Sequence, residues 1–268
     1  MQINSIFEKG TGAINEDFYC ISGNLFGVFD GATSLTDTVY EDGVTGGFLA
    51  SNIAGKTFAN NNASLASLAE KANQAIADAM AEREVNLYQR ENIWCTSAAV
   101  VRVHKELFEW VQTGDCLILV IFEDGTHEVL IKGFDHDLET FQLWKKFADT
   151  SHNPIMSEMA EQIKRVRSQM NVTYGVLNGE QCALDFLNHG GKSLQGIKNI
   201  LLFTDGLFIP HRDPKEKEDF KLFAQLFRKG GLANVKNYIR EVEETDGECR
   251  IYPRFKVHDD IAAIALTF

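Results

Sequence analysis

The sequence predicts an α+β fold in which antiparallel sheets carry helices on their outer faces. Apolar, β-branched segments come in runs that are joined by short turns, which is typical of antiparallel strands. Segments with helical periodicity form separate runs of their own. The 268 residues contain only four prolines and no repeat or linker-like stretch, so we predict one domain over residues 1–268.

The predicted strands begin with a hairpin. Residues 18–21 and 25–29 are apolar segments on either side of Ser22-Gly23-Asn24, which favours a tight turn. The other predicted strands share an apolar, β-branched composition and lie at residues 95–104, 107–113, 116–122, 128–131, 197–204 and 261–268. Short polar turns join the first three of these, so we expect them to form an antiparallel meander, with residues 128–131 as its fourth strand.

Amphipathic patterns predict the helices. Small or apolar residues recur at helical spacing in four segments, at residues 41–59, 64–89, 216–229 and 232–244. Gly230-Gly231 separates the last two. Residues 135–170 are more polar, with Trp144 and Ile163 among scattered apolar positions, and predict one or two further helices. We expect these to belong to an insert or flap at about residues 135–190.

Composition limits the classes of function. The net charge of −12 disfavours nonspecific binding to nucleic acid. The five cysteines include no C-x-x-C pair, which indicates a reducing compartment and argues against a thiolate zinc site. No apolar run reaches the length of a membrane span, and the first residues lack the pattern of a signal peptide. We therefore expect a cytoplasmic protein without a membrane or nucleic-acid partner.

Acidic residues stand at the ends or just before the starts of predicted strands. Asp30 ends the run LFGVFDG and Asp205 ends ILLFTDG. The other members of this set are Glu16, Asp17, Asp115, Asp259 and Asp260. Asp-Gly is a common turn dipeptide, and the chain has five of them. Asp124 and Asp246 lie in polar surroundings, so we interpret these two as simple turns.

A cluster of carboxylates needs compensation. Two carboxylates about 4 Å apart repel by roughly 4 kcal/mol at an effective dielectric constant near 20. This repulsion raises the pKa values of the carboxyl groups unless cations bind to them. Carboxylate oxygens suit Mg²⁺ or Mn²⁺, whereas the sequence has no H-x-x-x-H or H-E-x-x-H spacing for zinc.

Five motifs in order resemble those of the type 2C metal-dependent serine/threonine protein phosphatases, in particular the bacterial type. They are NED at residues 15–17, GVFDG at 27–31, CTSAAVV with TGDCLIL at 95–119, LLFTDGL at 201–207 and DDIAAIAL at 259–266. The resemblance runs from about residue 10 to the C-terminus. It implies a four-layer α-β-β-α sandwich, in which two antiparallel sheets are flanked by helices and a metal cleft lies at one edge.

The resemblance also implies a metal-binding set, which consists of Glu16, Asp17, Asp30, the carbonyl of Gly31, Asp115, Asp205 and Asp259. Asp30 would bridge two Mn²⁺ or Mg²⁺ ions, and Asp205 and Asp259 would complete the shell of one. Glu16 and Gly31 would hold the other ion, and Asp17 would orient bound water. Asp115 would help to hold a third ion. Asp30, Asp205 and Asp259 are therefore the predicted catalytic residues.

The implied reaction is hydrolysis of phosphoserine or phosphothreonine in proteins by a metal-bridging water, without a phosphoenzyme. Two departures from the family pattern stand out. Gly12 occupies the place of the arginine that clamps phosphate, and we expect Lys9, or Arg165 or Arg167 of the insert, to supply the charge. Ala32 occupies the place of a histidine found in eukaryotic members.

Two alternatives stay open at this level. The chain could be a pseudophosphatase that binds a partner without turnover, which the missing arginine favours. It could instead act on a small phosphoester. The sequence does not specify the physiological substrate or the oligomeric state.

Overall fold

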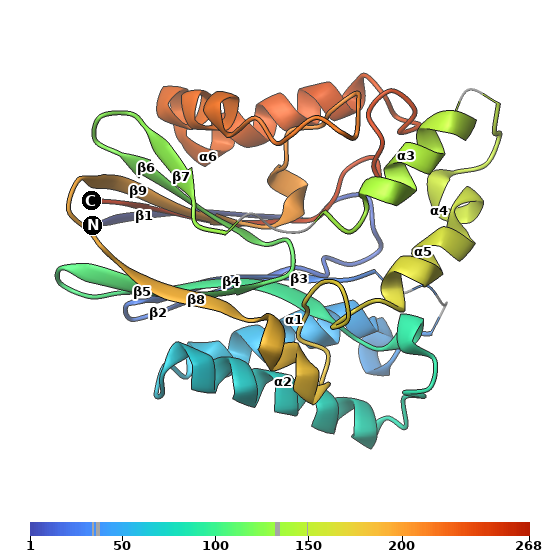
Figure 1. Ribbon diagram of the computed structural model, residues 1–268, viewed down its shortest axis with the longest axis horizontal. Helices are drawn as coiled ribbons and strands as arrows, with labels where there is room; N and C mark the ends of the chain where they lie inside the picture. Colours follow the sequence, from blue (N-terminus) through green and yellow to red (C-terminus); the bar gives the residue numbers. More distant parts are fainter. Residues whose placement is uncertain (34, 36–37, 132–134, 149) are drawn as a thin grey trace.

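The computed structural model describes residues 1–33, 35, 38–131, 135–148 and 150–268. Two five-stranded antiparallel sheets pack face to face, with helices on both outer faces (Figure 1). One sheet has the order β1 (Gln2–Glu8), β10 (Ile261–Thr267), β9 (Ile197–Phe203), β6 (Leu117–Phe122) and β7 (His127–Val129). The other has the order β2 (Phe18–Ser22), β3 (Leu25–Gly31), β4 (Thr96–Val103), β5 (Leu107–Thr113) and β8 (Asn188–Ser193). The predicted α-β-β-α sandwich is confirmed.

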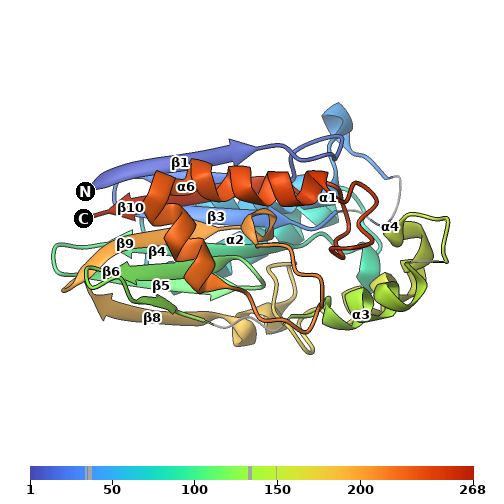
Figure 2. The ribbon, with the colours of Figure 1, turned by 90° about the horizontal axis from the view of Figure 1, so that it is seen from above.

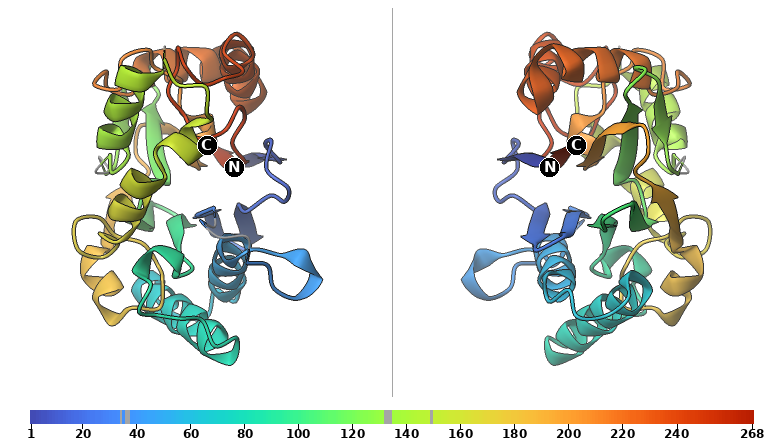
Figure 3. Two further views of the ribbon diagram at one scale, coloured as in Figure 1. Left: turned by 90° about the vertical axis from the view of Figure 1, so that its right-hand side faces the viewer. Right: turned by 90° about the vertical axis from the view of Figure 1, so that its left-hand side faces the viewer.

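Three long helices form the outer layers. Helices α1 (Gly46–Ala59) and α2 (Leu65–Glu82) cover the sheet that contains β3, and α6 (Phe220–Glu244) covers the other sheet. Figure 2 shows α6 from above, and the end-on views of Figure 3 separate the layers. The hydroxyls of Thr45 and Ser64 accept the hydrogen bonds that cap the starts of α1 and α2. Both helices begin and end within the segments that the sequence predicted.

The two predicted C-terminal helices form one element with a break. Gly230 and Gly231 have non-helical backbone angles inside α6, and Gly231 has a φ of 68°. A positive φ is easily adopted only by glycine. The break therefore lets both halves of α6 lay an apolar face on the sheet, with Phe223 before it and Val235 and Ile239 after it.

The central core lies between the two sheets. Its members are apolar side chains from facing strands, among them Phe26, Val28, Val120, Leu202 and Ile264. Alternation along each strand directs the neighbouring side chains to the outer layers, where they meet the helices. This packing fixes the two sheets relative to each other, so that strand ends from both sheets meet at one edge.

The strand pairing corrects part of the predicted meander. The β2–β3 hairpin and the β4–β5 and β6–β7 pairs form as expected. However, β6 does not continue beside β5: it crosses to the other sheet and pairs with β9. Strands β1 and β8 were not predicted. Residues of β1 are mostly exposed, and β8 has the polar sequence NHGGKS, so neither carries an apolar pattern.

Short helices gather at one end of the sandwich, on the right of Figure 1. They are α3 (Leu138–Phe147), α4 (Ile155–Glu158) and α5 (Ala160–Arg167), and they share a small apolar core around Trp144, Ile155 and Ile163. These helices lie in the predicted insert, in which residue 149 is outside the described residues. Short 3₁₀ turns complete the fold at Glu41–Gly43, Arg90–Asn92, Gln181–Phe186 and Asp205–Leu207. In the part of the chain that the structure describes, no helix is both long and apolar enough to cross a membrane.

Candidate active site

Acidic side chains from both sheets meet at the end of the sandwich that carries α3 to α5. Asp30 lies near the end of β3, Asp205 follows β9 and Asp259 precedes β10. Together with Asp115, which precedes β6, and with Gly31, they line one cavity of about 210 Å³. The structure thus brings five of the seven predicted metal-binding residues to a single cavity.

Asp30 and Asp205 are neighbours in this cavity, and the carboxyl group of each shifts the pKa of the other. Loss of hydration is the main reason that the pKa of each carboxyl lies well above its usual range. Negative neighbours raise the pKa further, above all Asp17 in the case of Asp30 and Asp30 in the case of Asp205. Carboxylates in such a position gain free energy by binding a proton or a cation.

The glycines of two Asp-Gly pairs permit close backbone contact. A Cβ atom on Gly31 would lie 2.2 Å from the carbonyl oxygen of Gly47 and 2.5 Å from that of Glu16. A Cβ atom on Gly206 would lie 1.9 Å from the carbonyl oxygen of Asp260. Neither contact is possible for another residue without moving the backbone. The Asp-Gly sequence at these strand ends therefore serves packing at the cavity as well as the turn.

Glu16 and Asp17 are buried behind the cavity, and neither is among its described lining residues. The hydroxyl of Thr204 donates to Asp17 over 2.7 Å. Loss of hydration is the main cause that raises the pKa of Asp17 well above its usual range. In Glu16, Oε1 accepts from the Thr45 hydroxyl at 2.5 Å and Oε2 from the Thr33 hydroxyl at 2.7 Å.

Asp260 has a structural role, although it belongs to the same set of acids in the sequence. Its two carboxylate oxygens accept hydrogen bonds from the backbone N–H groups of Gly10 and Glu16, at 2.7 and 2.8 Å. These bonds fix the connection between β1 and β2 against the start of β10. They hold Glu16 in place beside the cavity.

The donor set fits a divalent cation at one position. Asp30, Asp205 and Asp259 are oxygen donors that share the cavity, and burial together with neighbouring acids raises the pKa of Asp30 and Asp205. The need for a cation is smaller at Glu16, because each of its oxygens already accepts a hydrogen bond from a threonine hydroxyl. Within the described residues, no three His, Cys, Asp or Glu side chains are already drawn together as a metal-holding group.

The fold and the sequence motifs agree with a known protein family. A family profile described as protein phosphatase 2C matches residues 10–242, which is most of the chain. The chain belongs to the protein phosphatase 2C family. Membership gives the reaction class of this phosphatase, which is the hydrolysis of a phosphoric monoester. No curated protein sequence matches this chain significantly.

Solved structures of bacterial phosphatases share the fold. The serine/threonine phosphatase Stp1 from Staphylococcus aureus is 16% identical with a TM-score of 0.61, over 100% of this chain and 94% of that one. The serine/threonine phosphatase PstP from Mycobacterium tuberculosis is 15% identical with a TM-score of 0.59, over 98% of this chain and 97% of that one. The catalytic domain of PstP has also been solved in complex with two manganese ions, and that structure is 13% identical with a TM-score of 0.57, over 98% of this chain and 96% of that one.

Basic side chains reach the phosphatase cavity from the end of α5 and from the loop before β10. Arg167, which was among the expected candidates, lines the cavity and donates to the carbonyl oxygen of Thr33 at 2.6 Å. Arg165 is exposed and pairs with Glu139 instead. Lys9 is exposed, and its Nζ donates to a nearby backbone carbonyl at 3.3 Å. The structure therefore brings only Arg167 of these three to the described lining of the cavity.

Lys256 is a basic cavity residue that the sequence analysis missed. Its Nζ lies 2.8 Å from Oδ1 of Asp259 and 4.0 Å from Oε2 of Glu16. Burial by itself lowers the pKa of Lys256, but the charge and hydrogen bond of Asp259 outweigh it, so the pKa lies above its usual value. The side chain is therefore a permanent positive charge. Its position three residues before Asp259 was the only signal available in the sequence.

The insert contributes a second group that the sequence did not reveal. His136 and Asp137 line the cavity on the side of Asp115. The imidazole of His136 stacks on Tyr174 with ring centroids 4.2 Å apart, and its Nε2 lies 3.4 Å from Asp137 and 3.9 Å from Asp115. The insert thus forms one wall of the cavity and places a titratable ring against a predicted metal ligand.

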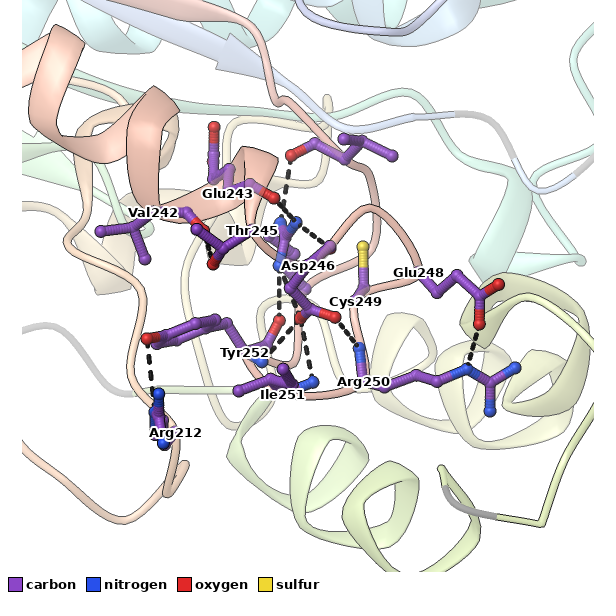
Figure 4. A network of polar contacts seen from close by, with 12 residues as sticks. Arg212, Val242, Glu243, Thr245, Asp246, Glu248, Cys249, Arg250, Ile251 and Tyr252 are labelled. Carbon is purple, nitrogen blue, oxygen red and sulfur yellow. Dashed lines mark hydrogen bonds and ion pairs between the residues drawn. The ribbon is translucent and has the colours of Figure 1, made fainter.

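Asp246 lies in a turn, as expected, but it is not a simple surface turn residue. It is only 6% exposed, and its carboxylate accepts from the backbone N–H groups of Arg250, Ile251 and Tyr252 at 2.8 to 2.9 Å (Figure 4). The guanidinium of Arg254 lies 3.2 Å away. Asp246 therefore organises the loop that leads to Lys256 and Asp259. By contrast, Asp124 does occupy an exposed turn.

Proposed function

We propose that this phosphatase hydrolyses phosphoserine or phosphothreonine in proteins with the help of Mn²⁺ or Mg²⁺. The observation that supports this most strongly is the convergence of Asp30, Asp205 and Asp259 from three strands on one cavity. Asp30 and Asp205 are desolvated, and their repulsion of neighbouring acids is relieved by a hard divalent cation. We therefore assign the catalytic role to these three residues.

The remaining predicted ligands would act around this group. The family resemblance predicts a second ion near Glu16 and the carbonyl of Gly31, water positioned by Asp17, and a third ion near Asp115. A bound cation supplies charge stabilisation for the phosphoryl oxygens and lowers the pKa of a water molecule for attack on phosphorus. Asp17 lies behind the cavity with Thr204 as its partner, which suits an orienting role more than direct contact with substrate.

The other side chains of the cavity suit a phosphorylated protein segment. Arg167 brings a guanidinium, which is a strong phosphate ligand. Apolar groups such as Met156 and Val166 line the insert side of the cavity and would shield the reaction from bulk water. The net charge of −12 argues against a nucleic-acid substrate. We propose a cytoplasmic phosphoprotein as the partner.

The test compares substrate classes. Purified protein with Mn²⁺ is assayed on a phosphothreonine peptide, a phosphotyrosine peptide and a panel of small phosphoesters. We expect kcat/KM to be highest for the phosphothreonine peptide. Equal or higher values for one small phosphoester would contradict the proposed substrate class and leave the phosphatase activity standing. Gly12, in place of the clamping arginine, is the observation that favours a pseudophosphatase, and absence of turnover on every substrate would support that alternative.

A further inference from the structure

Lys256 holds an unusual position among the basic residues of the chain. Its side chain is only 19% exposed, and it points between two acids that the family resemblance assigns to different ions, Asp259 and Glu16. The ammonium group contacts Asp259 at 2.8 Å and lies 4.0 Å from Glu16. It thus stands where positive charge is needed on the Glu16 side of the cavity.

The loop that carries Lys256 is firmly built. Asp246 collects three backbone N–H groups of this loop, and Arg254 donates to the carbonyl oxygens of Glu243, Asp246 and Val257 at 2.6 to 3.1 Å. On the other side, Arg240 donates to the carbonyl oxygen of Asp259 at 2.7 Å. These contacts fix the backbone on both sides of Lys256. The position of its side chain is therefore set by the fold and is not that of a mobile surface lysine.

Glu16 shows the matching feature. Its side chain is 7% exposed, and each carboxylate oxygen accepts a hydrogen bond from a threonine hydroxyl. A carboxylate with two hydroxyl donors and a nearby ammonium group is already compensated in the protein. Asp30 and Asp205 line the same cavity as two further acids, Asp115 and Asp259.

We propose that the ammonium group of Lys256 is a built-in cation of this phosphatase, which takes the place of a second divalent ion beside Glu16. The site then holds one divalent ion tightly, at Asp30 and Asp205, where other family members are expected to hold two. This inference rests on the proposed cation-dependent function, because it concerns the number of ions that the cavity holds. It explains how a chain with Gly12 in place of the clamping arginine keeps a fixed positive charge in the cavity.

The test is a count of bound Mn²⁺ by calorimetric titration in phosphate-free buffer, with metal analysis after dialysis. We expect one tightly bound ion in the natural protein and two in Lys256→Met, with the second ion binding at least about tenfold more tightly than it does to the natural protein. Lys256→Arg retains the charge and should bind one ion. Lys236→Met is the matched control, since Lys236 is 25% exposed and pairs with Glu8 at 2.6 Å outside the cavity; it should bind one ion.

Two tight ions in the natural protein would overturn the inference, whether or not Lys256→Met folds. One ion in both the natural protein and Lys256→Met would also overturn it, because Lys256 would then not be what excludes the second ion. Hydrolysis of p-nitrophenyl phosphate separates these results from a failure of the proposed function. Mn²⁺-dependent turnover with two bound ions removes only this inference, whereas no bound ion and no turnover removes both.

Discussion

Asp205 and Asp246 are both followed by glycine, yet their carboxylates meet opposite surroundings. Asp246 receives three backbone N–H groups (Figure 4) and lies 3.2 Å from the guanidinium of Arg254, so its charge is compensated by the chain. Asp205 faces Asp30, Asp259 and Asp115, whose charges raise its pKa. The chain itself supplies the hydrogen-bond donors that Asp246 needs. The charge of Asp205 is compensated only when a cation binds.

The difference shows how a buried carboxylate can be assigned a role. Where the chain supplies the donors, the acid stabilises the fold. Where the chain supplies further acids, folding costs free energy that a ligand can return. In this phosphatase the two kinds are linked, because the centre at Asp246 positions the segment that delivers Asp259 to the cavity.

The largest expected effect is on turnover in Asp205→Asn. Loss of a charged ligand at the reacting group should reduce hydrolysis of p-nitrophenyl phosphate in Mn²⁺ by at least about 1,000-fold. The free energy of unfolding in EDTA should stay equal or rise, because a source of repulsion is removed. Asp124→Asn, at an exposed Asp-Gly turn, is the control and should change neither quantity. A large loss of stability in Asp205→Asn would mean that Asp205, like Asp246, supports the fold, and would contradict the distinction between the two carboxylates.

The converse change is Asp246→Ala. It leaves three partly buried N–H groups without their acceptor and removes the carboxylate partner of Arg254, so we expect a loss of about 3–5 kcal/mol in the free energy of unfolding, measured by urea titration. Asp124→Ala should lose less than about 0.5 kcal/mol. A loss of similar size in both variants would show that the network around Asp246 adds nothing to stability.

Metal addition should stabilise the protein through the cavity acids. At a Mn²⁺ concentration about 100 times its dissociation constant, the natural protein should gain about 2.7 kcal/mol of stability relative to EDTA. Asp205→Asn should gain much less, whereas Asp124→Asn should gain the full amount. An equal gain in all three proteins would mean that Mn²⁺ binds away from the cavity.

The smallest expected effect concerns the basic side chains. Arg167→Met should raise KM for p-nitrophenyl phosphate about tenfold, because its guanidinium lines the cavity. Lys9→Met should leave KM within about twofold, because Lys9 faces solvent. The opposite order would restore Lys9 as the substitute for the arginine that is replaced by Gly12.

Local patterns were enough to predict the elements that bear the cavity acids. The apolar runs before Asp30 and Asp205 form β3 and β9, and the run after Asp260 forms β10. Strands β1 and β8 were missed, because they form by pairing with neighbouring strands and have no buried apolar pattern of their own. The polar strand β8 has no apolar pattern of its own and is held by its register with β5. The crossing of β6 to the second sheet is likewise decided by packing between distant segments.

The role of Asp246 and the position of Lys256 could not be predicted for the same reason. Asp246 gathers N–H groups only once its loop closes, and Lys256 reaches Glu16 across 240 positions of sequence, from residue 16 to residue 256. The sequence shows where the acids stand along the chain, but not which side chains lie beside each of them in space. The structure adds the partners, and these distinguish an acid that supports the fold from one that awaits a cation.

The most direct test of the central claim is the dependence of p-nitrophenyl phosphate hydrolysis on Mn²⁺, with protein that has first been treated with EDTA. The account predicts no turnover in EDTA and full recovery as Mn²⁺ is added, over the same concentration range in which Mn²⁺ raises the melting temperature. Turnover that persists undiminished in EDTA would contradict the assignment of Asp30, Asp205 and Asp259 as the cation-binding centre of this phosphatase.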